Sequence, residues 1–217
     1  MVRLAPAAQY RRVTDAEKLR LVAAKYGVGE RFVLNVGGLD MRKNVQGLIG
    51  AFAAVYHELR DPELRLFIAG DTKRLGTSPL FPDWRPLAST WGVADRVLCA
   101  QVDEEDLPAL YSAASCFAFA STYEGFGLTP LEAIACGAPV VCSDRTSLPE
   151  VVGSAGLLIN PEDTDAFANS ILRVLTQSEL RSDLRQRGLA RVRQFSWDQV
   201  AVETSALYAE VTGTKRV

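Results

Sequence analysis

The chain has 217 residues, of which 48% are hydrophobic and 23% are charged, and its formal net charge at pH 7 is −2. This composition is that of a soluble globular protein, and the slightly acidic balance argues against bulk nucleic-acid binding, which usually needs a basic face. The start, MVRLAPAAQYRR, lacks a signal-peptide core, and no apolar run reaches the roughly 20 residues that span a bilayer, so we expect a cytoplasmic protein that at most rests on a membrane.

The first half of the sequence alternates between strand-like and helix-like segments. The capping box Thr14-Asp15-Ala16-Glu17 predicts a helix that runs to about Tyr26. Short apolar runs predict strands, and apolar residues at helical spacing predict helices. We expect strands over residues 32–36, 64–69 and 96–99, helices over residues 45–60 and 104–114, and the least regular structure over residues 72–92.

The second half continues this alternation and ends in three helices, the last opened by the capping box Ser196-Trp197-Asp198-Gln199. Apolar strands joined by crossing helices are typical of a parallel sheet that is buried on both faces. The sequence therefore predicts one α/β domain over residues 1–217, with a Rossmann-like, doubly wound parallel sheet. We expect strands over residues 116–120, 138–142 and 156–159, and helices over residues 130–136, 163–175, 178–194 and 197–211.

The cysteines and the single histidine argue against a zinc site. Cys99, Cys116, Cys136 and Cys142 lie in apolar surroundings without C-x-x-C spacing, and His57 falls in the middle of a predicted helix. We expect reduced, buried thiols, as in a cytoplasmic protein, and neither a metal nor a cofactor.

Glycines, small hydroxyls and charged residues collect at the ends of the predicted strands. The segments that follow the strands include Gly37–Asn44, Gly70–Asp71, Ala100–Asp103, Ser121–Gly127 and Ser143–Asp144. Ligands of open parallel sheets bind at the carboxyl ends of the strands. We therefore expect a ligand site along this edge.

The stretch from Glu124 to Glu132 combines two acids with a turn and a helix start. Gly125 and Gly127 allow a tight turn and a close approach of the backbone to a ligand. Thr129 is expected to cap the following helix, and the proline after it fits the first helical position. Free N–H groups at such a start suit a phosphate, and Glu132 in the first turn could accept hydrogen bonds from a ribose.

Three further side chains complete this constellation. Glu124 could accept hydroxyls of a second polyol, and Arg42 and Lys43 could neutralise a diphosphate. Together these groups suit a nucleotide diphospho-sugar. A structural reading stays open, because glycine turns are common in α/β proteins, a helix dipole favours Glu132 whatever the ligand, and Arg42-Lys43 alone fits a solvated pair.

These residues carry a resemblance to a known family. Tyr123–Ala133 (YEGFGLTPLEA), with Gly137–Val141 (GAPVV), resembles the E-x7-E signature of the retaining GT-B glycosyltransferases of the glycosyl transferases group 1 family. Val36–Asn44 (VGGLDMRKN) is similar to the glycine loop of that family. Asp103–Ala114 and Phe195–Trp197 resemble its base-side helix and its closing helix. The resemblance covers nearly the whole chain and implies the donor-binding half of a GT-B fold.

The resemblance also implies roles for individual residues. Glu124 would bind the donor sugar, Lys43 with Arg42 would neutralise the leaving diphosphate, and Glu132 would bind the ribose. The backbone near Val102 would hold the base. The sugar and diphosphate would lie against the glycine loop and the glycine turn, whose residues are Gly37, Gly38, Phe126, Gly127, Leu128 and Thr129.

The sequence departs from the family pattern in two places. Gly38 stands where the family often has an arginine that serves as a second diphosphate cation, a role that Arg42 could take over. The acceptor-binding half of a GT-B enzyme lies N-terminal to the donor half, whereas this chain begins almost where the donor half begins. We therefore expect an N-terminal acceptor-binding domain or separate subunit as a partner, and no activity of this domain alone.

The expected reaction is retaining transfer of a sugar from a nucleotide diphosphate, with GDP-mannose weakly preferred over a UDP-sugar by resemblance. A non-catalytic nucleotide-sugar-binding module, such as a sensor or a partner subunit, stays open as an alternative. A hydrolysing or epimerising GT-B relative is disfavoured, because the sequence offers no acid–base groups that we can assign to such chemistry.

Two further motifs receive structural interpretations. Asp163-Thr164-Asp165 matches a D-x-D metal motif of another glycosyltransferase fold, but its place before an apolar helix predicts a helix cap. Five arginines between residues 181 and 193 could touch an anionic membrane. Because their spacing scatters around the helix, with Glu179 and Asp183 among them, we expect a solvated face.

Overall fold

The computed structural model describes residues 4–213, so residues 1–3 and 214–217 of the expected domain lie outside the described part. At its centre is a six-stranded sheet with the order β3-β2-β1-β4-β5-β6, in which neighbouring strands pair in parallel. The predicted α/β class and doubly wound parallel sheet are thereby confirmed. The strands are β1 (Phe32–Val36), β2 (Arg65–Ala69), β3 (Val97–Ala100), β4 (Cys116–Phe119), β5 (Val140–Ser143) and β6 (Gly156–Ile159).

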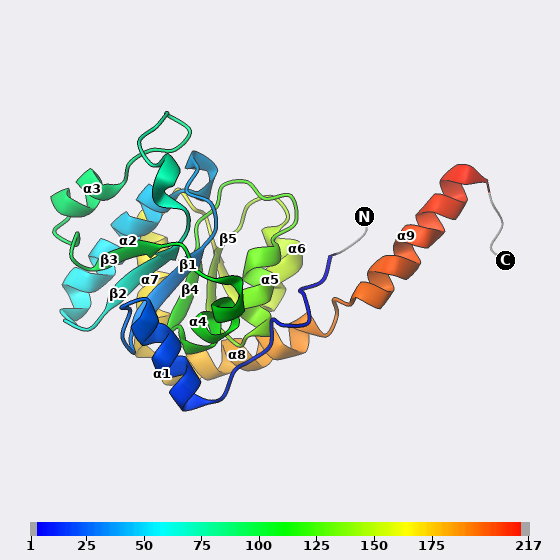
Figure 1. Ribbon diagram of the computed structural model, residues 1–217, viewed down its shortest axis with the longest axis horizontal. Coiled ribbons are helices and arrows are strands. Elements are labelled where there is room, and N and C mark those ends of the chain that lie inside the picture. The colour runs from blue at the N-terminus through cyan, green and yellow to red at the C-terminus, as the bar shows by residue number, and fades with distance from the viewer. Residues whose placement is uncertain (1–3, 214–217) are drawn as a thin grey trace.

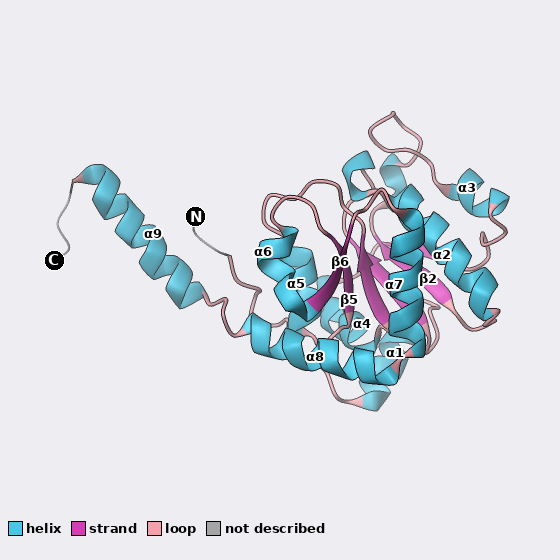
Figure 2. Cartoon of the chain, turned by 180° about the vertical axis from the view of Figure 1, so that it is seen from behind, coloured by secondary structure: helices cyan, strands magenta, loops and turns pink. Residues whose placement is uncertain are grey.

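Helices cover both faces of the sheet. Figure 1 shows α1, α4 and α5 in front of it, and Figure 2, from behind, shows α7 in front. α6 belongs to the face of α5, α2 and α3 belong to the face of α7, and α8 contacts both α5 and α7. The helices are α1 (Ala16–Lys25), α2 (Val45–Leu59), α3 (Arg85–Thr90), α4 (Leu107–Ala113), α5 (Leu128–Ala135), α6 (Leu148–Val152), α7 (Thr164–Thr176), α8 (Ser178–Val192) and α9 (Trp197–Thr212).

The strands divide their side chains between two buried cores. Successive residues of a strand point to opposite faces of the sheet. In β1, Val33 joins the core beneath α2 and α7, whereas Phe32 and Leu34 join the core beneath α4 and α5. All three side chains are fully buried. This burial on both faces explains why the strands read as continuous apolar runs rather than as alternating patterns.

The first helix is capped one residue later than its sequence predicts. The N-cap of α1 is Asp15, not Thr14, and its carboxylate accepts hydrogen bonds from the N–H groups of Glu17 and Lys18. Both residue types cap helices well, so the sequence alone could not decide between two adjacent candidates.

The start of α5 also differs from the prediction. Its N-cap is Gly127, whose φ is +104°, and α5 already begins at Leu128. Thr129 therefore lies inside the first turn and does not cap it, and Glu132 lies in the second turn rather than the first. The left-handed backbone of a glycine, and not a hydroxyl group, turns the chain into this helix.

The expected irregular segment over residues 72–92 contains more structure than predicted. It holds a short 3-10 helix (Thr72–Arg74) and α3, which buries Ala88 beside the buried Trp84. α6 was not predicted either. Helices of five or six residues show too little of the 3.6-residue period to be recognised.

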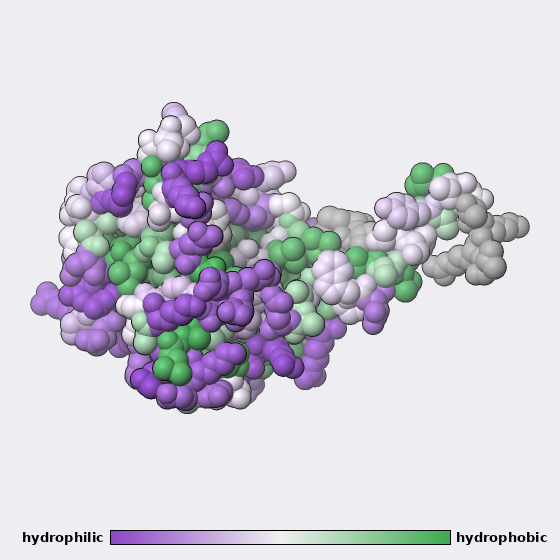
Figure 3. Space-filling model, viewed as in Figure 1, coloured by the Kyte–Doolittle hydropathy of each residue, from purple (hydrophilic) through white to green (hydrophobic). Residues whose placement is uncertain are grey.

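The last helix projects away from the body of the molecule (Figure 1). No residue of α9 is buried among the described residues, and Figure 3 shows apolar surface along this helix. Trp197 at its start donates a hydrogen bond from Nε1 to the carbonyl oxygen of Pro6, at 3.2 Å. Over residues 4–213, no helix has the length and apolar character needed to cross a membrane.

Candidate functional site

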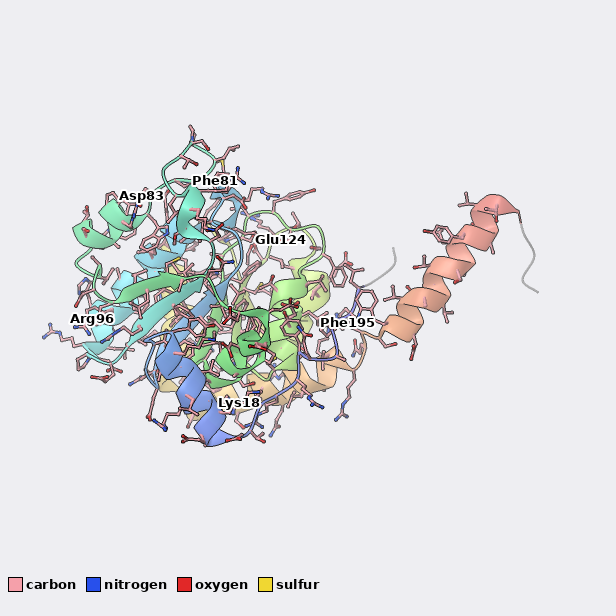
Figure 4. The ribbon with its side chains drawn as sticks, viewed as in Figure 1. Lys18, Phe81, Asp83, Arg96, Glu124 and Phe195 are labelled. Atoms are coloured by element: carbon pink, nitrogen blue, oxygen red, sulfur yellow. The ribbon has the colours of Figure 1, made fainter. Side chains whose placement is uncertain are left out.

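The predicted site residues lie where the connections of the sheet diverge. β1 and β4 are neighbours at the centre of the sheet. The chain leaves β1 toward α2 on one face and leaves β4 toward α5 on the other. In doubly wound sheets such a switch point opens a crevice at the carboxyl ends of the strands, and ligands bind there. Figure 4 labels Glu124 close to this edge.

Hydrogen bonds join the loop after β1 to the loop after β4. The carbonyl oxygen of Arg42 accepts from the N–H of Thr122 at 2.7 Å, from its hydroxyl at 3.1 Å, and from the hydroxyl of Ser121 at 3.2 Å. Three donors on one acceptor hold the two loops in a fixed relation. The two loops carry Lys43 and Glu124, two of the predicted charged residues.

Lys43 and Glu124 form an ion pair across the switch point. Lys43 Nζ lies 2.5 Å from Glu124 Oε1, and the two side chains are only 17% and 16% exposed. The ammonium also lies 5.4 Å from the centre of the Phe119 ring, within the range of a cation–π contact. The structure thus brings together two residues that the sequence places 81 positions apart.

The loop that follows a third strand, β5, binds the backbone of Glu124. Its N–H donates to Thr146 Oγ1 at 3.1 Å, and its carbonyl oxygen accepts from Ser147 Oγ at 3.1 Å. Both residues belong to the loop between β5 and α6. Sequence analysis missed them, although the polar residues directly after β5 had pointed to this loop.

Arg42 pairs with Asp40, whereas its neighbour Lys43 pairs with Glu124. Arg42 Nε lies 2.8 Å from Asp40 Oδ1, and the arginine side chain is 59% exposed. This hydrogen bond raises the pKa of the guanidinium. Gly38 is exposed on the same loop. The structure therefore gives Lys43 a shielded position next to Glu124 and leaves Arg42 at the surface beside Asp40.

Two glycines of the site have backbones that other residues rarely adopt. The φ of Gly127 is +104°, and a Cβ atom there would lie 2.8 Å from Leu148 Cδ2. The φ of Gly37 is +146°, and Lys43 Cε would lie 3.9 Å from a Cβ at that position. A side chain at Gly127 would collide with α6, and one at Gly37 would meet the lysine.

The start of α5 has no side-chain cap among the described residues. The N–H groups of Leu128 and Thr129 therefore face no capping side chain there. Phe126, just before the turn, packs edge-on against Phe195, with ring centres 6.2 Å apart. Val102, the residue predicted beside a base, is half-buried against the core beneath α4 and α5.

Glu132 belongs to a separate cluster with two tyrosines. Tyr111 is fully buried, and its hydroxyl lies 3.4 Å from Glu132 Oε2. Tyr10, from the segment before α1, packs edge-on against Tyr111 with ring centres 6.2 Å apart. Burial raises the pKa of Glu132 to about 7, the hydrogen bond from Tyr111 lowers it, and the charge of Glu104 raises it. Sequence analysis missed Tyr111, because its position on an apolar helix face gives no polar signal.

Because the pKa of Glu132 is raised, we expect the stability of Glu132→Gln to differ from that of the unmodified chain in a pH-dependent way. Between about pH 4.5 and 7 the folded chain keeps a proton that the unfolded chain loses, so Glu132 lowers the free energy of unfolding as the pH rises through this range. Glu132→Gln should therefore melt above the unmodified chain at pH 8. Since the carboxyl group keeps part of its solvation, we expect a gain of about 2–4 °C, as ~1 kcal/mol gives in a chain of this size.

Thermal unfolding at pH 4.5 and pH 8 measures this difference. At pH 4.5 most of the gain should vanish, because the folded carboxyl group is then protonated and about half of the unfolded carboxyl groups are protonated too. The exposed Glu105 offers the matched control Glu105→Gln, which should change little at either pH. An equal gain for Glu132→Gln at both pH values would contradict the proposed burial effect.

A wide surface cavity of about 1040 Å³ lies away from these residues. It is formed by the segment before α1, the first turn of α1 and the segment that runs from β3 into α4. Its lining carries both cations, such as Arg12 and Lys18, and acids, such as Glu104. Its lining includes none of the predicted site residues. Because its charges are mixed and it opens broadly to solvent, we place the candidate site at the switch point.

The structure tests the two motifs that received structural interpretations, the D-x-D motif and the arginines of α8. Asp163 caps α7, since its carboxylate accepts from the N–H of Ala166 at 2.9 Å, which confirms the predicted helix cap. The expected solvated arginine face of α8 is wrong for three residues. Arg181, Arg185 and Arg191 are half-buried and donate to carbonyl oxygens of the protein. These hydrogen bonds fasten α8 to its neighbours.

Comparison with known proteins gives consistent matches. The family model described as "Glycosyl transferases group 1" matches residues 23–191. The chain is 36% identical over 213 residues to O-antigen chain mannosyltransferase B of Escherichia coli, and the match covers 95% of this chain and 53% of that protein. The chain thus spans about half the length of this curated relative.

Two solved structures also match this chain over about half of their own length. Sucrose-phosphate synthase of Thermosynechococcus elongatus superposes with a TM-score of 0.80 at 30% identity, over 98% of this chain and 52% of the other. The Anabaena protein HepE, solved in complex with UDP and glucose, gives a TM-score of 0.80 at 22% identity, over 95% and 55% of the chains. At that identity the second match shows the fold alone.

Proposed function

Because this chain belongs to the glycosyl transferases group 1 family, we propose that it binds a nucleotide diphospho-sugar and forms the donor half of a retaining glycosyltransferase. The observation that carries the proposal is the Lys43–Glu124 pair at the switch point between β1 and β4. A cation, a carboxylate and an open helix start at one sheet edge match the diphosphate and the sugar of such a donor.

The chemistry assigned to these groups is electrostatic. In the transfer, the bond between the anomeric carbon and the diphosphate oxygen breaks, and negative charge grows on the diphosphate. An acceptor hydroxyl oxygen forms the new bond to that carbon, and the leaving diphosphate takes up the hydroxyl proton. Lys43 and the N–H groups at the start of α5 would stabilise that charge where it develops. Glu124, released from Lys43, would accept hydrogen bonds from the sugar hydroxyls. The proposal invokes no metal and no cofactor.

Two further predicted residues would hold the nucleoside. Glu132 would bind the ribose, and the backbone near Val102 would hold the base. The relative from Escherichia coli is a mannosyltransferase, so GDP-mannose is the first donor to test. UDP-sugars come second, because the similarly folded HepE was solved with UDP and glucose.

The exposed face of α9 supports a second domain as partner. Side chains spaced three and four residues apart lie on one side of this helix, and Trp197, Leu207 and Val211 among them are 51%, 49% and 78% exposed. The face includes Trp197, Val200, Thr204, Leu207, Tyr208 and Val211, of which Val200 and Thr204 are half-buried. We assign it to packing against the acceptor-binding half, in line with a curated relative of which this chain covers 53%.

Calorimetric titration tests the donor site. We expect the chain to bind one of GDP, UDP and ADP, or one of their common sugar conjugates, and Glu132→Ala to weaken that binding. If none of these compounds binds at millimolar concentration, the proposed donor site is wrong for this chain.

A non-catalytic nucleotide-sugar-binding module is the second candidate. It is favoured by Gly38, which stands where the family often has a cation, and by the pairing of Arg42 with Asp40. Sugar transfer after addition of the acceptor-binding half separates the candidates. The enzyme should then turn over its donor, whereas the module should bind it without consuming it.

A further inference from the structure

Thr146 has an unusual backbone for its residue type. Its φ is +51°, in the left-handed region where a β-branched side chain is strained. Its side chain is exposed, so burial of apolar surface does not explain the conformation. A strained residue that persists at a site calls for an explanation in what its side chain does.

The side chain of Thr146 contacts the residue proposed to bind the sugar. Thr146 Oγ1 accepts the N–H of Glu124 at 3.1 Å, and the hydroxyl of Ser147 donates to the carbonyl oxygen of Glu124 at 3.1 Å. Two adjacent hydroxyls therefore bind both backbone polar groups of one residue. This fixes the backbone from which the Glu124 carboxylate reaches Lys43.

The loop between β5 and α6 is itself held by other contacts. The N–H of Asp144 donates to the carbonyl oxygen of Ile159 at 3.0 Å. The N–H of Arg145 donates to Ser143 Oγ at 3.1 Å, and its guanidinium donates to Asn160 Oδ1 at 2.8 Å. These bonds fasten the loop to the ends of β5 and β6, so the loop can impose a position on Glu124.

We propose that Thr146 and Ser147 are positioning residues that hold Glu124 for the donor sugar, which makes the loop after β5 part of sugar recognition. The inference rests on the proposed function, because it takes Glu124 as the sugar-binding acid. It assigns the effect to the hydroxyl of Thr146 and not to its methyl group or its backbone.

Three substitutions of Thr146 separate these contributions. Thr146→Val keeps the shape and loses the hydroxyl, Thr146→Ser keeps the hydroxyl, and Thr146→Gly loses the side chain but also the strain. The measured quantity is the affinity for a nucleotide-sugar divided by that for the same nucleoside diphosphate, using the pair that binds in the titration. We expect about a tenfold lower ratio for the valine and glycine variants, as loss of one positioning hydrogen bond gives.

The glycine and serine variants exclude a merely structural role. Thr146→Gly should melt no lower than the unmodified chain while its ratio falls, because the strain is relieved. Thr146→Ser should keep the ratio of the unmodified chain. An unchanged ratio in Thr146→Val, or a serine variant as impaired as the valine variant, would overturn the inference.

A second measurement needs no ligand. If Thr146 positions Glu124, its loss should free Lys43 from the ion pair and raise the rate at which a water-soluble acetylating reagent modifies that lysine, followed by peptide mass spectrometry. Glu124→Gln is the positive control. If the unmodified chain binds no nucleotide, the proposed function is wrong, and the acetylation rate of Lys43 then tests the inference by itself. Equal acetylation rates in Thr146→Gly and in the unmodified chain would overturn the inference.

Discussion

Replacement of Lys43 by methionine should weaken binding of the nucleoside diphosphate by about 10- to 100-fold, the range expected from loss of a hydrogen bond between charged groups. The ammonium is only 17% exposed and lies at the switch point, so water screens its attraction to a phosphate less than at an open surface. Methionine keeps most of the side-chain volume beside Phe119. Isothermal calorimetry with the nucleotide measures the loss.

The neighbouring arginine supplies the matched control for this substitution. Arg42 carries the same charge one residue earlier, but it is exposed and paired with Asp40. We expect Arg42→Met to weaken binding by less than about threefold, because exposed ion pairs contribute little. If Arg42→Met weakened binding as much as Lys43→Met, the assignment of the diphosphate cation to Lys43 would be wrong.

Substitution of Gly127 by alanine should both destabilise the chain and abolish nucleotide binding. Alanine at a φ of +104° is strained, and its Cβ would lie 2.8 Å from Leu148 Cδ2. Backbone strain of this kind costs roughly 1–3 kcal/mol, which corresponds to a melting temperature lower by about 2–12 °C in a chain of this size. Because Gly127 is the N-cap of α5, the strain also displaces the helix start proposed to bind the diphosphate.

Gly125, two residues earlier, provides the comparison. Its φ is not among the positive ones, and within the described residues no atom lies within 4 Å of an added Cβ. Gly125→Ala should therefore keep the melting temperature within about 2 °C, as surface substitutions usually do. Equal losses for the two alanine variants would contradict the special role of the Gly127 backbone.

The sheet was predictable because its signal lies within single segments. Each strand is a short apolar run, and each long helix shows the 3.6-residue period, so element types followed from local sequence. The predicted convergence of polar residues also followed, since parallel strands end at one edge. The structure confirms the fold and brings Lys43 to Glu124, two residues to which both the residue types and the resemblance had assigned separate roles.

What escaped prediction depends on contacts between distant segments. The hydrogen bonds between the backbone of Glu124 and the hydroxyls of Thr146 and Ser147 join residues 22 and 23 positions apart, and no local pattern marks them. In the sequence, Tyr111 fits the apolar face of a helix and shows no sign of a polar role. In the structure, its hydroxyl lies beside Glu132. The start of α5 depends on the φ of Gly127, which a preference for hydroxyl caps does not reveal.

The edge-on contact between Phe126 and Phe195 links the turn before α5 to the joint between α8 and α9. Phe195 is only 7% exposed and shares its small apolar cluster with Leu131 of α5 and Val151 of α6. A motion of α9 that displaced Phe195 would also have to repack Phe126, because closely packed side chains leave little free space between them. Such a displacement would reach the turn that precedes Gly127.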